Sequence, residues 1–396
     1  MKPAPKIFGH HEEGTLKQLR DVASRAERTA LMADGHLGYI MPIGGVAAYR
    51  GKVSVAGVGF DIACGNAAIR TDLTLDTVPD LNEAADAIFD TFEFGIGRSE
   101  RSKDAPRDHP LFDSPAWEHV PASHRAELRQ RARDQLGTIG SGNHYIDVFA
   151  DEKDGHIWVG VHFGSRGLGH TIASSFMAMH QGQKWGTRAK ETEALLSLDS
   201  KLGAAYWDLM NLAGEYAYAG REWVARKTVD LLGGRELELV HNHHNFAWKE
   251  EHFGEELVVV RKGATPAFPG QKSFVGGSMG DNAVILQGAT EVTQEQRDAL
   301  FSTVHGAGRV MSRTEAAGRW DRRRRKMRTP GRVTEDMRDS WLRREGVILR
   351  GSGLDEAPQA YRRLKDVLKA QGDTIEVLHD LKPLIVVMAG SGTFTP

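Results

Sequence analysis

The sequence predicts a single α+β domain over residues 1–396, a mixture of β-sheets with helices around them. Three observations predict this class. Strand-like runs and amphipathic helical segments follow one another along the chain. The chain has no internal repeat, linker or low-complexity stretch that would divide it. The composition, with 40% hydrophobic and 26% charged residues, is that of a globular protein with a sizeable core.

The first part of the chain predicts one helix followed by loops and strands. Leu16, Leu19 and Val22 recur at helical spacing between charged residues, which indicates an amphipathic helix over 14–30. Glycine-punctuated loop and strand should follow as far as Gly59, with a strand at 52–56. Further strands are expected at 66–71, 145–149, 156–161, 256–261, 283–286 and 384–388. Further helices are expected at 80–93, 122–133, 202–231, 293–301 and 356–371.

Charge and cysteine content restrict the class of protein. The chain has 51 basic and 53 acidic residues, so nucleic-acid binding would have to come from a local patch. A single cysteine excludes internal disulfides and fits a reducing compartment. No window has the roughly 18 to 20 apolar residues of a membrane span, and the N-terminus lacks the apolar core of a signal peptide. We therefore expect a cytoplasmic protein that does not bind a membrane.

A run of five imidazole and amide side chains at 241–245 (HNHHN) indicates a metal site. Three other short stretches are expected to converge on it: 61–64 (DIAC), 142–144 (GNH), and 161–162 ahead of 164–167 (GSRG). Taken alone, each histidine is more often structural than a ligand. Together the stretches hold a carboxylate, a thiolate and imidazoles, which suit a divalent transition metal. The candidate ligands are Asp61, Cys64, His144, His162 and His244.

Five donors exceed what one tetrahedral ion uses. Two ions that share the Cys64 thiolate are therefore the natural arrangement. Aspartate and histidine ligands with open positions favour manganese or zinc over magnesium. The residues thus predict a metalloenzyme.

Three glycine-rich segments indicate that phosphate is bound near the metals. They lie at 164–169 (GSRGLG), 276–280 (GGSMG) and 305–308 (HGAG), and Arg261, Lys262 and Arg309 accompany them. Small residues let phosphate oxygens approach backbone N–H groups, and arginine holds phosphate with two hydrogen bonds. None of the segments has a Walker or Rossmann pattern. A nucleotide or polynucleotide phosphate site is the favoured interpretation, although a single such loop is more often a turn.

His305 differs from the metal-binding histidines because glycines follow it and no carboxylate lies nearby in the sequence. In this setting the imidazole could act as a nucleophile toward phosphorus and form a phosphoramidate. A further metal ligand or a helix-capping histidine is about as probable from the residues alone. The residues leave these alternatives open.

Many segments of the chain together resemble the RtcB family of RNA-splicing ligases. They occur in the order of that family and cover residues 32–388. The matching segments are DGHLG at 34–38, PIGG at 42–45, VGFDIACG at 58–65, LGTIGSGNH at 136–144, HFGSRGLG at 162–169, HHN at 243–245, RKGA at 261–264, GSMG at 277–280, HGAGRVMSR at 305–313 and DEAP at 355–358.

The resemblance implies a ligase that uses GTP and two Mn²⁺ ions to join an RNA 3′-phosphate or 2′,3′-cyclic phosphate end to a 5′-hydroxyl end. It implies the same five metal ligands and a catalytic His305 that carries GMP before GMP passes to the RNA 3′-phosphate. The implied nucleotide contacts are Asn143, Asp147, Asn245, Gly276, Gly277, Ser278, Met279, Gly306, Ala307 and Gly308. The candidates for holding RNA phosphates are Arg166, Arg261, Lys262, Arg309 and Arg313.

The chain departs from the family pattern at the end that binds the base. Met388 stands where the family has a lysine that contacts guanine, and Ala283 stands where a serine is usual. Gly276 replaces a proline, and Asp147 replaces a glutamate. These changes touch nucleotide recognition and leave the metal ligands and His305 in place. A site without one of its hydrogen bonds to the base has roughly 1 to 3 kcal/mol less discrimination, so we expect the preference for guanine to be relaxed.

A basic run at 319–332 contains eight Arg or Lys residues in fourteen, with Asp321 as its only acidic residue. Such a run is about as often a solvated surface as a binding site. Because it follows the His305 segment in an otherwise neutral chain, we predict that it contacts RNA phosphates, with Arg322–Arg325 at its centre.

Two other functions remain open from the sequence. One is a metal-dependent protein that binds RNA ends without sealing them, which the loss of the terminal lysine favours. The other is a dinuclear phosphoesterase, for which His305 would be dispensable. RNA ends and GTP are the expected partners, with an activating protein as a further candidate and the oligomeric state open.

Overall fold

A large mixed β-sheet forms the centre of the molecule in the computed structural model, which describes residues 2–188, 190–321 and 326–390. Its strands run in the order β13, β14, β19, β6, β7, β5 and β9, and β18 pairs with β19 in parallel. The bounds are β13 Lys272–Val275, β14 Ala283–Gly288, β19 Ile375–Gly390, β6 Tyr145–Asp151, β7 His156–Phe163, β5 Gly65–Thr74, β9 Glu236–His243 and β18 Ile348–Ser352.

A second sheet lies beside the first and is continuous with it through the chain. Its strand order is β1, β2, β3, β11 and β10. The strand β9 of the large sheet ends at His243 and β10 begins at Asn245, so His244 alone joins the two sheets at this point. The bounds are β1 Lys6–Ile7, β2 Arg28–His36, β3 Ile43–Tyr49, β11 Glu255–Lys262 and β10 Asn245–His252.

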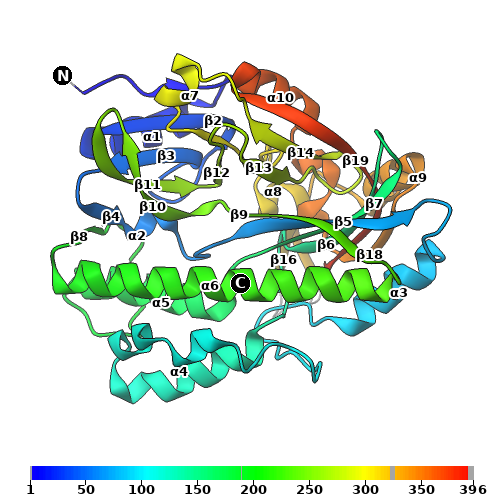
Figure 1. The fold of residues 1–396 in the computed structure, drawn as a ribbon, viewed down its shortest axis with the longest axis horizontal. Helices are drawn as coiled ribbons and strands as arrows, with labels where there is room; N and C mark the ends of the chain where they lie inside the picture. Colours follow the sequence, from blue (N-terminus) through cyan, green and yellow to red (C-terminus); the bar gives the residue numbers. More distant parts are fainter. Residues whose placement is uncertain (1, 189, 322–325, 391–396) are drawn as a thin grey trace.

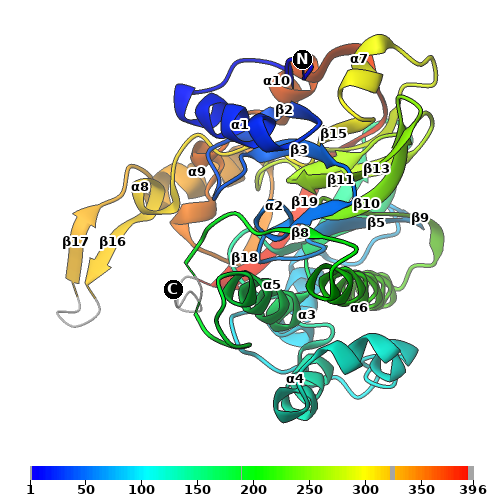
Figure 2. The same ribbon diagram turned by 90° about the vertical axis from the view of Figure 1, so that its left-hand side faces the viewer.

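Three short antiparallel pairs complete the strands. They are β12 (Ala264–Pro266) with β15 (Ser302–Val304), β4 (Lys52–Ser54) with β8 (Leu195–Ser197), and β16 (Gly318–Asp321) with β17 (Lys326–Pro330). The β16–β17 hairpin projects from the body of the molecule (Figure 2). Its basic run includes Arg322–Arg325, which lie outside the described residues.

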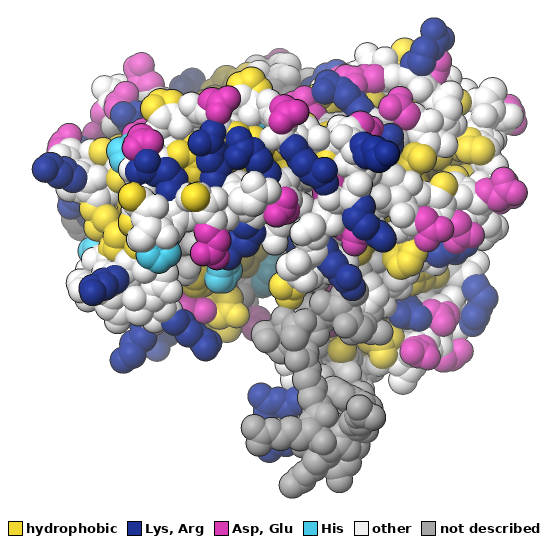
Figure 3. Space-filling view, turned by 90° about the horizontal axis from the view of Figure 1, so that it is seen from below, with side chains coloured by type: hydrophobic (Ala, Val, Ile, Leu, Met, Phe, Trp, Pro, Cys, Tyr) yellow, Lys and Arg dark blue, Asp and Glu magenta, His cyan; other side chains and the backbone are white. Residues whose placement is uncertain are grey.

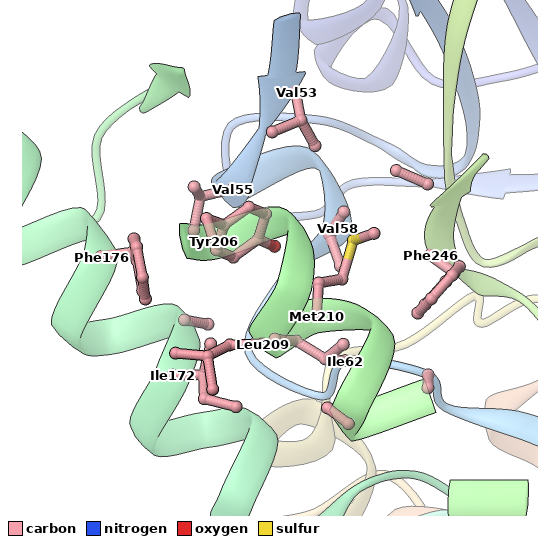
Figure 4. Packing of buried hydrophobic residues seen from close by; sticks show 14 of the residues in the cluster. Val53, Val55, Val58, Ile62, Ile172, Phe176, Tyr206, Leu209, Met210 and Phe246 are labelled. Atoms are coloured by element: carbon pink, nitrogen blue, oxygen red, sulfur yellow. The ribbon is translucent and has the colours of Figure 1, made fainter. Parts of the chain in front are cut away.

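The long helix α6 (Lys201–Leu231) crosses one face of the large sheet, with α5 (Arg166–His180) and α4 (Ala122–Gln135) beyond it (Figure 1). Tyr206, Leu209 and Met210 of α6 pack against Ile172 and Phe176 of α5 in the largest hydrophobic cluster (Figure 4). Burial of each such side chain contributes roughly 1.5 to 3 kcal/mol. Ile62 and Ala63 of the turn at 61–64 belong to the same cluster, so the packing of α5 and α6 supports this turn.

Seven further helices lie in the described residues. They are α1 Glu13–Arg25, α2 Val55–Val58, α3 Leu81–Thr91, α7 Gln294–Asp298, α8 Arg313–Ala317, α9 Glu335–Glu345 and α10 Leu364–Gln371. Five 3₁₀ turns are η1 Pro110–Asp113, η2 Pro115–His119, η3 Leu354–Glu356, η4 Pro358–Ala360 and η5 Gly372–Thr374. The expected α+β class is confirmed.

Several expected element boundaries are wrong, each for a local reason. The first helix ends at Arg25, and β2 begins at Arg28 because the apolar residues at 30–33 are buried in the sheet. The strand expected at 52–56 stops at Ser54, whose hydroxyl caps α2 by accepting from the Gly57 N–H at 2.8 Å. The helix expected at 293–301 ends at Asp298, since Leu300 and Phe301 adopt positive φ.

Two further helices differ from expectation. The helix expected at 356–371 is confined to α10, and two 3₁₀ turns occupy the residues around Pro358. The glycine-rich stretch at 164–169 is not a free loop, because α5 begins at Arg166 within it. Within the described residues, every helix is too short or too polar to cross a membrane.

Candidate active site

The turn between α2 and β5 carries two of the predicted ligands. The Cys64 N–H donates to the Asp61 carbonyl at 3.1 Å, and Ala63 adopts a φ of +60° in the turn. Ile62 between them packs into the core beneath (Figure 4). A side chain at position 164 would collide with the Asp61 carboxylate, so glycine is needed there. Asp61 and Cys64 therefore project from one rigid turn.

His144 and His162 both present Nε2 to this turn. The Nδ1 atoms lie 2.9 Å from the carbonyl oxygens of Ile139 and Asn143, respectively. Because a carbonyl only accepts, Nδ1 carries the proton in each ring. His162 Nε2 therefore keeps its lone pair, whereas His144 Nε2 faces the Asp61 carboxylate at 3.0 Å. His162 Nε2 lies 3.3 Å and His144 Nε2 3.8 Å from the Cys64 sulfur.

His244 completes the cluster from the junction of the two sheets. Its N–H donates to the Cys64 carbonyl at 2.8 Å, and its ring centroid lies 5.2 Å from that of His162. The donor atoms form two triads that share the thiol sulfur. These are Cys64, His162 and His244, and Asp61, Cys64 and His144, with the ligand atoms of each triad within 4.8 Å of one another.

The protonation states of His162, His244 and Asp61 suit cation binding at this cluster. Burial lowers the pKa of His162 to about 3 and that of His244 well below its usual value, so both rings are neutral. Burial raises the pKa of Asp61, but its hydrogen bond and charge interaction with His144 outweigh this and lower it to about 2. Burial raises the pKa of the Cys64 thiol. Soft and borderline donors in this mixture fit a divalent transition metal.

His305 is held next to the cluster by a carboxylate. Its Nδ1 lies 2.6 Å from Asp34 Oδ2, and the same oxygen accepts the backbone N–H of His305 at 3.0 Å and of Gly306 at 3.2 Å. Asp34 is completely buried, and the His305 ring centroid lies 4.9 Å from that of His244. This partner was not predicted from the sequence, because Asp34 stands 271 residues away. The only indication of its importance in the sequence is that Asp34 belongs to the DGHLG segment at 34–38, which resembles a motif of the RtcB family.

Two of the glycine-rich segments lie side by side near His305. Gly276 and Gly306 form a β-bridge. A side chain at position 276 would meet the Tyr145 hydroxyl, and Gly308 has a φ of +74°. Backbone N–H groups can approach a ligand closely where no side chain stands in the way. This bridge brings the segment 276–280, with Gly277, Ser278 and Met279, beside the segment 305–308, with Ala307.

The other expected nucleotide contacts divide into two kinds. Asn143 and Asn245 hold the cluster in shape: Asn143 accepts from His162, and Asn245 accepts from the Gly263 N–H at 2.7 Å. Asp147 on β6 is 8% exposed, and its Oδ1 has no hydrogen-bond partner among the described residues. Burial raises the pKa of Asp147 well above its usual range. An unsatisfied buried carboxyl is costly and is expected to have a function.

The cationic candidates lie in different environments. Arg166 has a φ of +56°, and its Nη1 lies 3.3 Å from His144 Nδ1, so it contacts the cluster. Lys262 donates to the carbonyls of Tyr39 at 2.8 Å and Ala56 at 3.0 Å. Burial lowers the pKa of Lys262 to about 8.

The other three arginines are paired with carboxylates of the chain. Arg261 is fully buried and binds Glu250 with both terminal nitrogens, at 2.6 and 3.0 Å. Arg309 binds Glu356 at 3.0 Å, and Arg313 binds both Asp355 and Glu356. The donors of Arg261 and Arg309 are thus used inside the fold. Arg313 stays a candidate because its guanidinium borders the loop at 142–144.

Met388 lies in an apolar cluster on the face of the large sheet that carries Asp147. It is 5% exposed and packs with Met279, Leu342 and Val386, beside Tyr145. Asp147 pairs in register with Val386 on β19, two residues before Met388. The position where the family has lysine is therefore apolar and close to a buried carboxyl with one unpartnered oxygen.

Comparisons with known proteins agree with this arrangement. The model of a family described as "tRNA-splicing ligase RtcB" matches residues 16–389. The chain is 32% identical to the RNA-splicing ligase RtcB of Escherichia coli K12, covering 90% of this chain and 89% of that protein. It is 33% identical to the tRNA-splicing ligase RtcB of Thermococcus kodakarensis, covering 90% and 87%.

Fold, ligand cluster and relatives together define an enzyme of the ligase class with a buried site able to hold metal. Within that class, the chain belongs to the RtcB family of RNA ligases.

Proposed function

We propose that this protein joins an RNA 3′-phosphate or 2′,3′-cyclic phosphate end to a 5′-hydroxyl end, with GTP and two Mn²⁺ ions, in tRNA splicing or RNA repair. The observation that carries the proposal is the position of His305. Its Nδ1 faces Asp34 at 2.6 Å, while its ring adjoins His244 of the ligand cluster. A histidine oriented by a carboxylate beside a metal-type donor set is suited to nucleophilic attack on phosphorus.

The two triads would hold one ion each and share Cys64. When bound, the ions would neutralise negative charge on the triphosphate and on the RNA 3′-phosphate. His162 already presents the Nε2 lone pair that coordination requires, because its Nδ1 proton is committed to a carbonyl. His144 would exchange the contact of its Nε2 with the Asp61 carboxylate for a bond to the ion. Aspartate and histidine donors suit manganese or zinc better than magnesium, and the resemblance to the RtcB family favours manganese.

Nucleotidyl transfer would begin at His305. With Nδ1 protonated beside the Asp34 carboxylate, Nε2 would have the lone pair that forms a bond to the α-phosphorus of GTP while the bond to pyrophosphate breaks. The carboxylate stabilises the positive charge that develops on the ring. An oxygen of the RNA 3′-phosphate then takes the GMP group from Nε2. The 5′-hydroxyl attacks the activated 3′-phosphorus, GMP leaves, and the hydroxyl proton is lost.

Guanine selectivity is proposed to be weaker than the resemblance alone implies. A buried, protonated Asp147 can donate one hydrogen bond to a base and accept another, whereas the apolar Met388 can only contact it. Arg166 is the strongest candidate for holding RNA phosphate, since it borders the cluster.

The first test is the intact mass of the protein after incubation with Mn²⁺ and each of the four nucleoside triphosphates, beside a His305→Ala control. The expected result is one added GMP that the variant lacks. Adducts from several nucleotides would support the mechanism with relaxed selectivity. The absence of any adduct on metal-loaded protein would contradict the proposal and favour an RNA-end binding protein or a phosphoesterase.

A further inference from the structure

Arg221 of α6 is a fully buried arginine directly beneath the ligand cluster. Its guanidinium makes four hydrogen bonds. Nη1 donates to the Ala63 carbonyl at 2.8 Å and to the Phe163 carbonyl at 2.6 Å. Nη2 lies 2.8 Å from His243 Nδ1, and Nε donates to His241 Nε2 at 2.8 Å. A guanidinium only donates, so both imidazole nitrogens accept.

The acceptors of Arg221 have a pattern with respect to the metal ligands. Ala63 precedes Cys64, Phe163 follows His162, and His243 precedes His244. One side chain therefore bonds to the residue next to each member of a single triad. These three residues come from the α2–β5 turn, the end of β7 and the end of β9, which only the tertiary fold brings together.

The second triad shares only part of this support, because Ala63 lies in the turn that carries both Asp61 and Cys64. The ring of His144 is held instead by the Ile139 carbonyl and by the Asp61 carboxylate, which lies 3.0 Å from its Nε2. Arg221 therefore bonds beside all three ligands of the first triad but does not bond beside His144 of the second.

An aromatic ring packs on the two histidines that accept hydrogen bonds from Arg221. The Tyr218 ring stacks on His243 with centroids 3.9 Å apart and meets His241 edge-on at 4.2 Å. A side chain at position 65 would collide with the Asn242 carbonyl oxygen and the His243 backbone of β9, and it would also reach Arg221 Nη2 at 3.0 Å.

Arg221 is an unusual structural residue because of its charge. Among the described residues, none of the carboxylates forms an ion pair with it. Burying an arginine without a carboxylate partner is costly, even with carbonyl and imidazole acceptors. A residue that acted only in packing could be apolar. The buried guanidinium donates hydrogen bonds to three segments that carry metal ligands, which is a role that an apolar side chain could not fill.

We propose that Arg221 is a positioning residue that fixes the Cys64–His162–His244 triad and so controls the affinity of one of the two metal ions. The proposal rests on the two-ion site of the proposed function. Without the guanidinium, three segments lose their common hydrogen-bond donor, and the ligands of this triad are no longer held at coordination distance from one another.

The test measures Mn²⁺ binding directly, by calorimetric titration and by the metal content of the purified protein. Arg221→Met removes the donors and keeps an apolar stem of similar length. His144→Ala removes a ligand of the other triad, and His244→Ala removes one of this triad. Arg226→Met is the matched control on the same helix, where the arginine is exposed and pairs with Glu222 and Glu236.

The wild type and Arg226→Met are expected to bind two ions. Arg221→Met is expected to bind one ion normally and the other about 10- to 100-fold more weakly, as is typical when a residue that supports metal ligands is replaced. Its titration should match that of His244→Ala for the ion that remains. Adding His144→Ala to Arg221→Met should weaken the remaining ion as well.

Wild-type affinity at both sites in Arg221→Met would overturn the inference, as would an equal loss at both sites in protein that circular dichroism shows to be folded. If Arg221→Met does not fold, Arg221→Lys decides, because it keeps the charge and reaches fewer acceptors. The same one-site weakening, smaller in size, is then expected. A wild type that binds no Mn²⁺ would overturn the proposed two-ion site, and the inference with it.

Discussion

At the scale of single residues, the site depends on carboxyl groups whose surroundings give them different roles. Asp34 is buried and accepts two backbone N–H groups while facing His305. Asp61 stands at the cluster with a pKa of about 2. Asp147 is buried with a raised pKa and an unpartnered oxygen. One side-chain type thus serves as an orienting group, a candidate ligand and a candidate base contact.

Asp34→Asn should slow nucleotidyl transfer to His305 by on the order of 10²-fold, the usual cost of losing a group that handles a proton in the transition state. The amide can still accept the backbone N–H groups but carries no charge to stabilise a cationic ring. Single-turnover labelling with radioactive GTP would measure the rate. Asp366→Asn, at an exposed carboxylate on α10, is the control. A wild-type rate in Asp34→Asn would show that the carboxylate has no part in the step.

Asp147→Asn should alter the pH dependence of stability. A carboxyl whose pKa is raised on folding contributes its full stability below its unfolded pKa of about 3.9 and loses it as pH rises through the folded value. The amide does not titrate. The variant should therefore gain stability relative to the wild type as pH rises from 5 to 8, as judged by urea unfolding. A constant difference over this range would mean that Asp147 does not bind a proton on folding.

At the scale of elements, strand ends and helix ends decide what the glycine-rich segments do. The segment at 164–169 makes room for Asp61 and then begins α5. The segments at 276–280 and 305–308 instead lie side by side through the Gly276–Gly306 bridge. On the face seen in Figure 3, Lys and Arg side chains are interspersed with Asp and Glu. RNA binding would then depend on local elements such as the β16–β17 hairpin.

The double variant Arg319→Ala, Arg328→Ala tests this hairpin, where both side chains are exposed. It should weaken binding of single-stranded RNA and reduce the slope of log affinity against log salt by roughly 0.7 for each phosphate that the variant no longer neutralises. Fluorescence anisotropy at several salt concentrations measures both quantities. Arg235→Ala, an exposed arginine after α6, controls for net charge. An equal loss of guanylylation in the double variant would mean that the hairpin is structural.

At the scale of the whole molecule, the ligand cluster lies where the two sheets meet. Cys64 precedes β5 of the large sheet, His162 lies in β7, and His244 is the single residue between β9 and β10. An ion bound here would connect segments that are far apart in the sequence. Metal binding should consequently stabilise the fold as a whole.

Removal of metal by a chelator should lower the midpoint of thermal unfolding. At free Mn²⁺ one hundred times the Kd, binding to the folded state alone contributes about 2.7 kcal/mol per ion. Differential scanning calorimetry with and without excess Mn²⁺ measures this effect. Cys64→Ala should abolish most of it, since both triads share the thiolate. Equal midpoints with and without Mn²⁺ in the wild type would contradict the dinuclear site.

Local sequence was sufficient for much of this protein. The helix at 202–231 was predicted almost to the residue, because its apolar spacing persists over many turns and outweighs the glycines within it. The five donors were predicted because each stands in a short segment with glycine or asparagine, a pattern readable without the fold. The match to RtcB motifs was likewise a property of the chain.

The partners of these groups were decided by tertiary structure alone. Asp34 reaches His305 across 271 residues, and Arg221 bonds to one turn and the ends of two strands. Arg261 and Arg309 look like phosphate ligands in the sequence, yet the fold gives each of them a carboxylate of its own. The physical reason is that spacing along the chain specifies which face a side chain takes, whereas hydrogen-bond and ion-pair partners depend on which distant segments pack together.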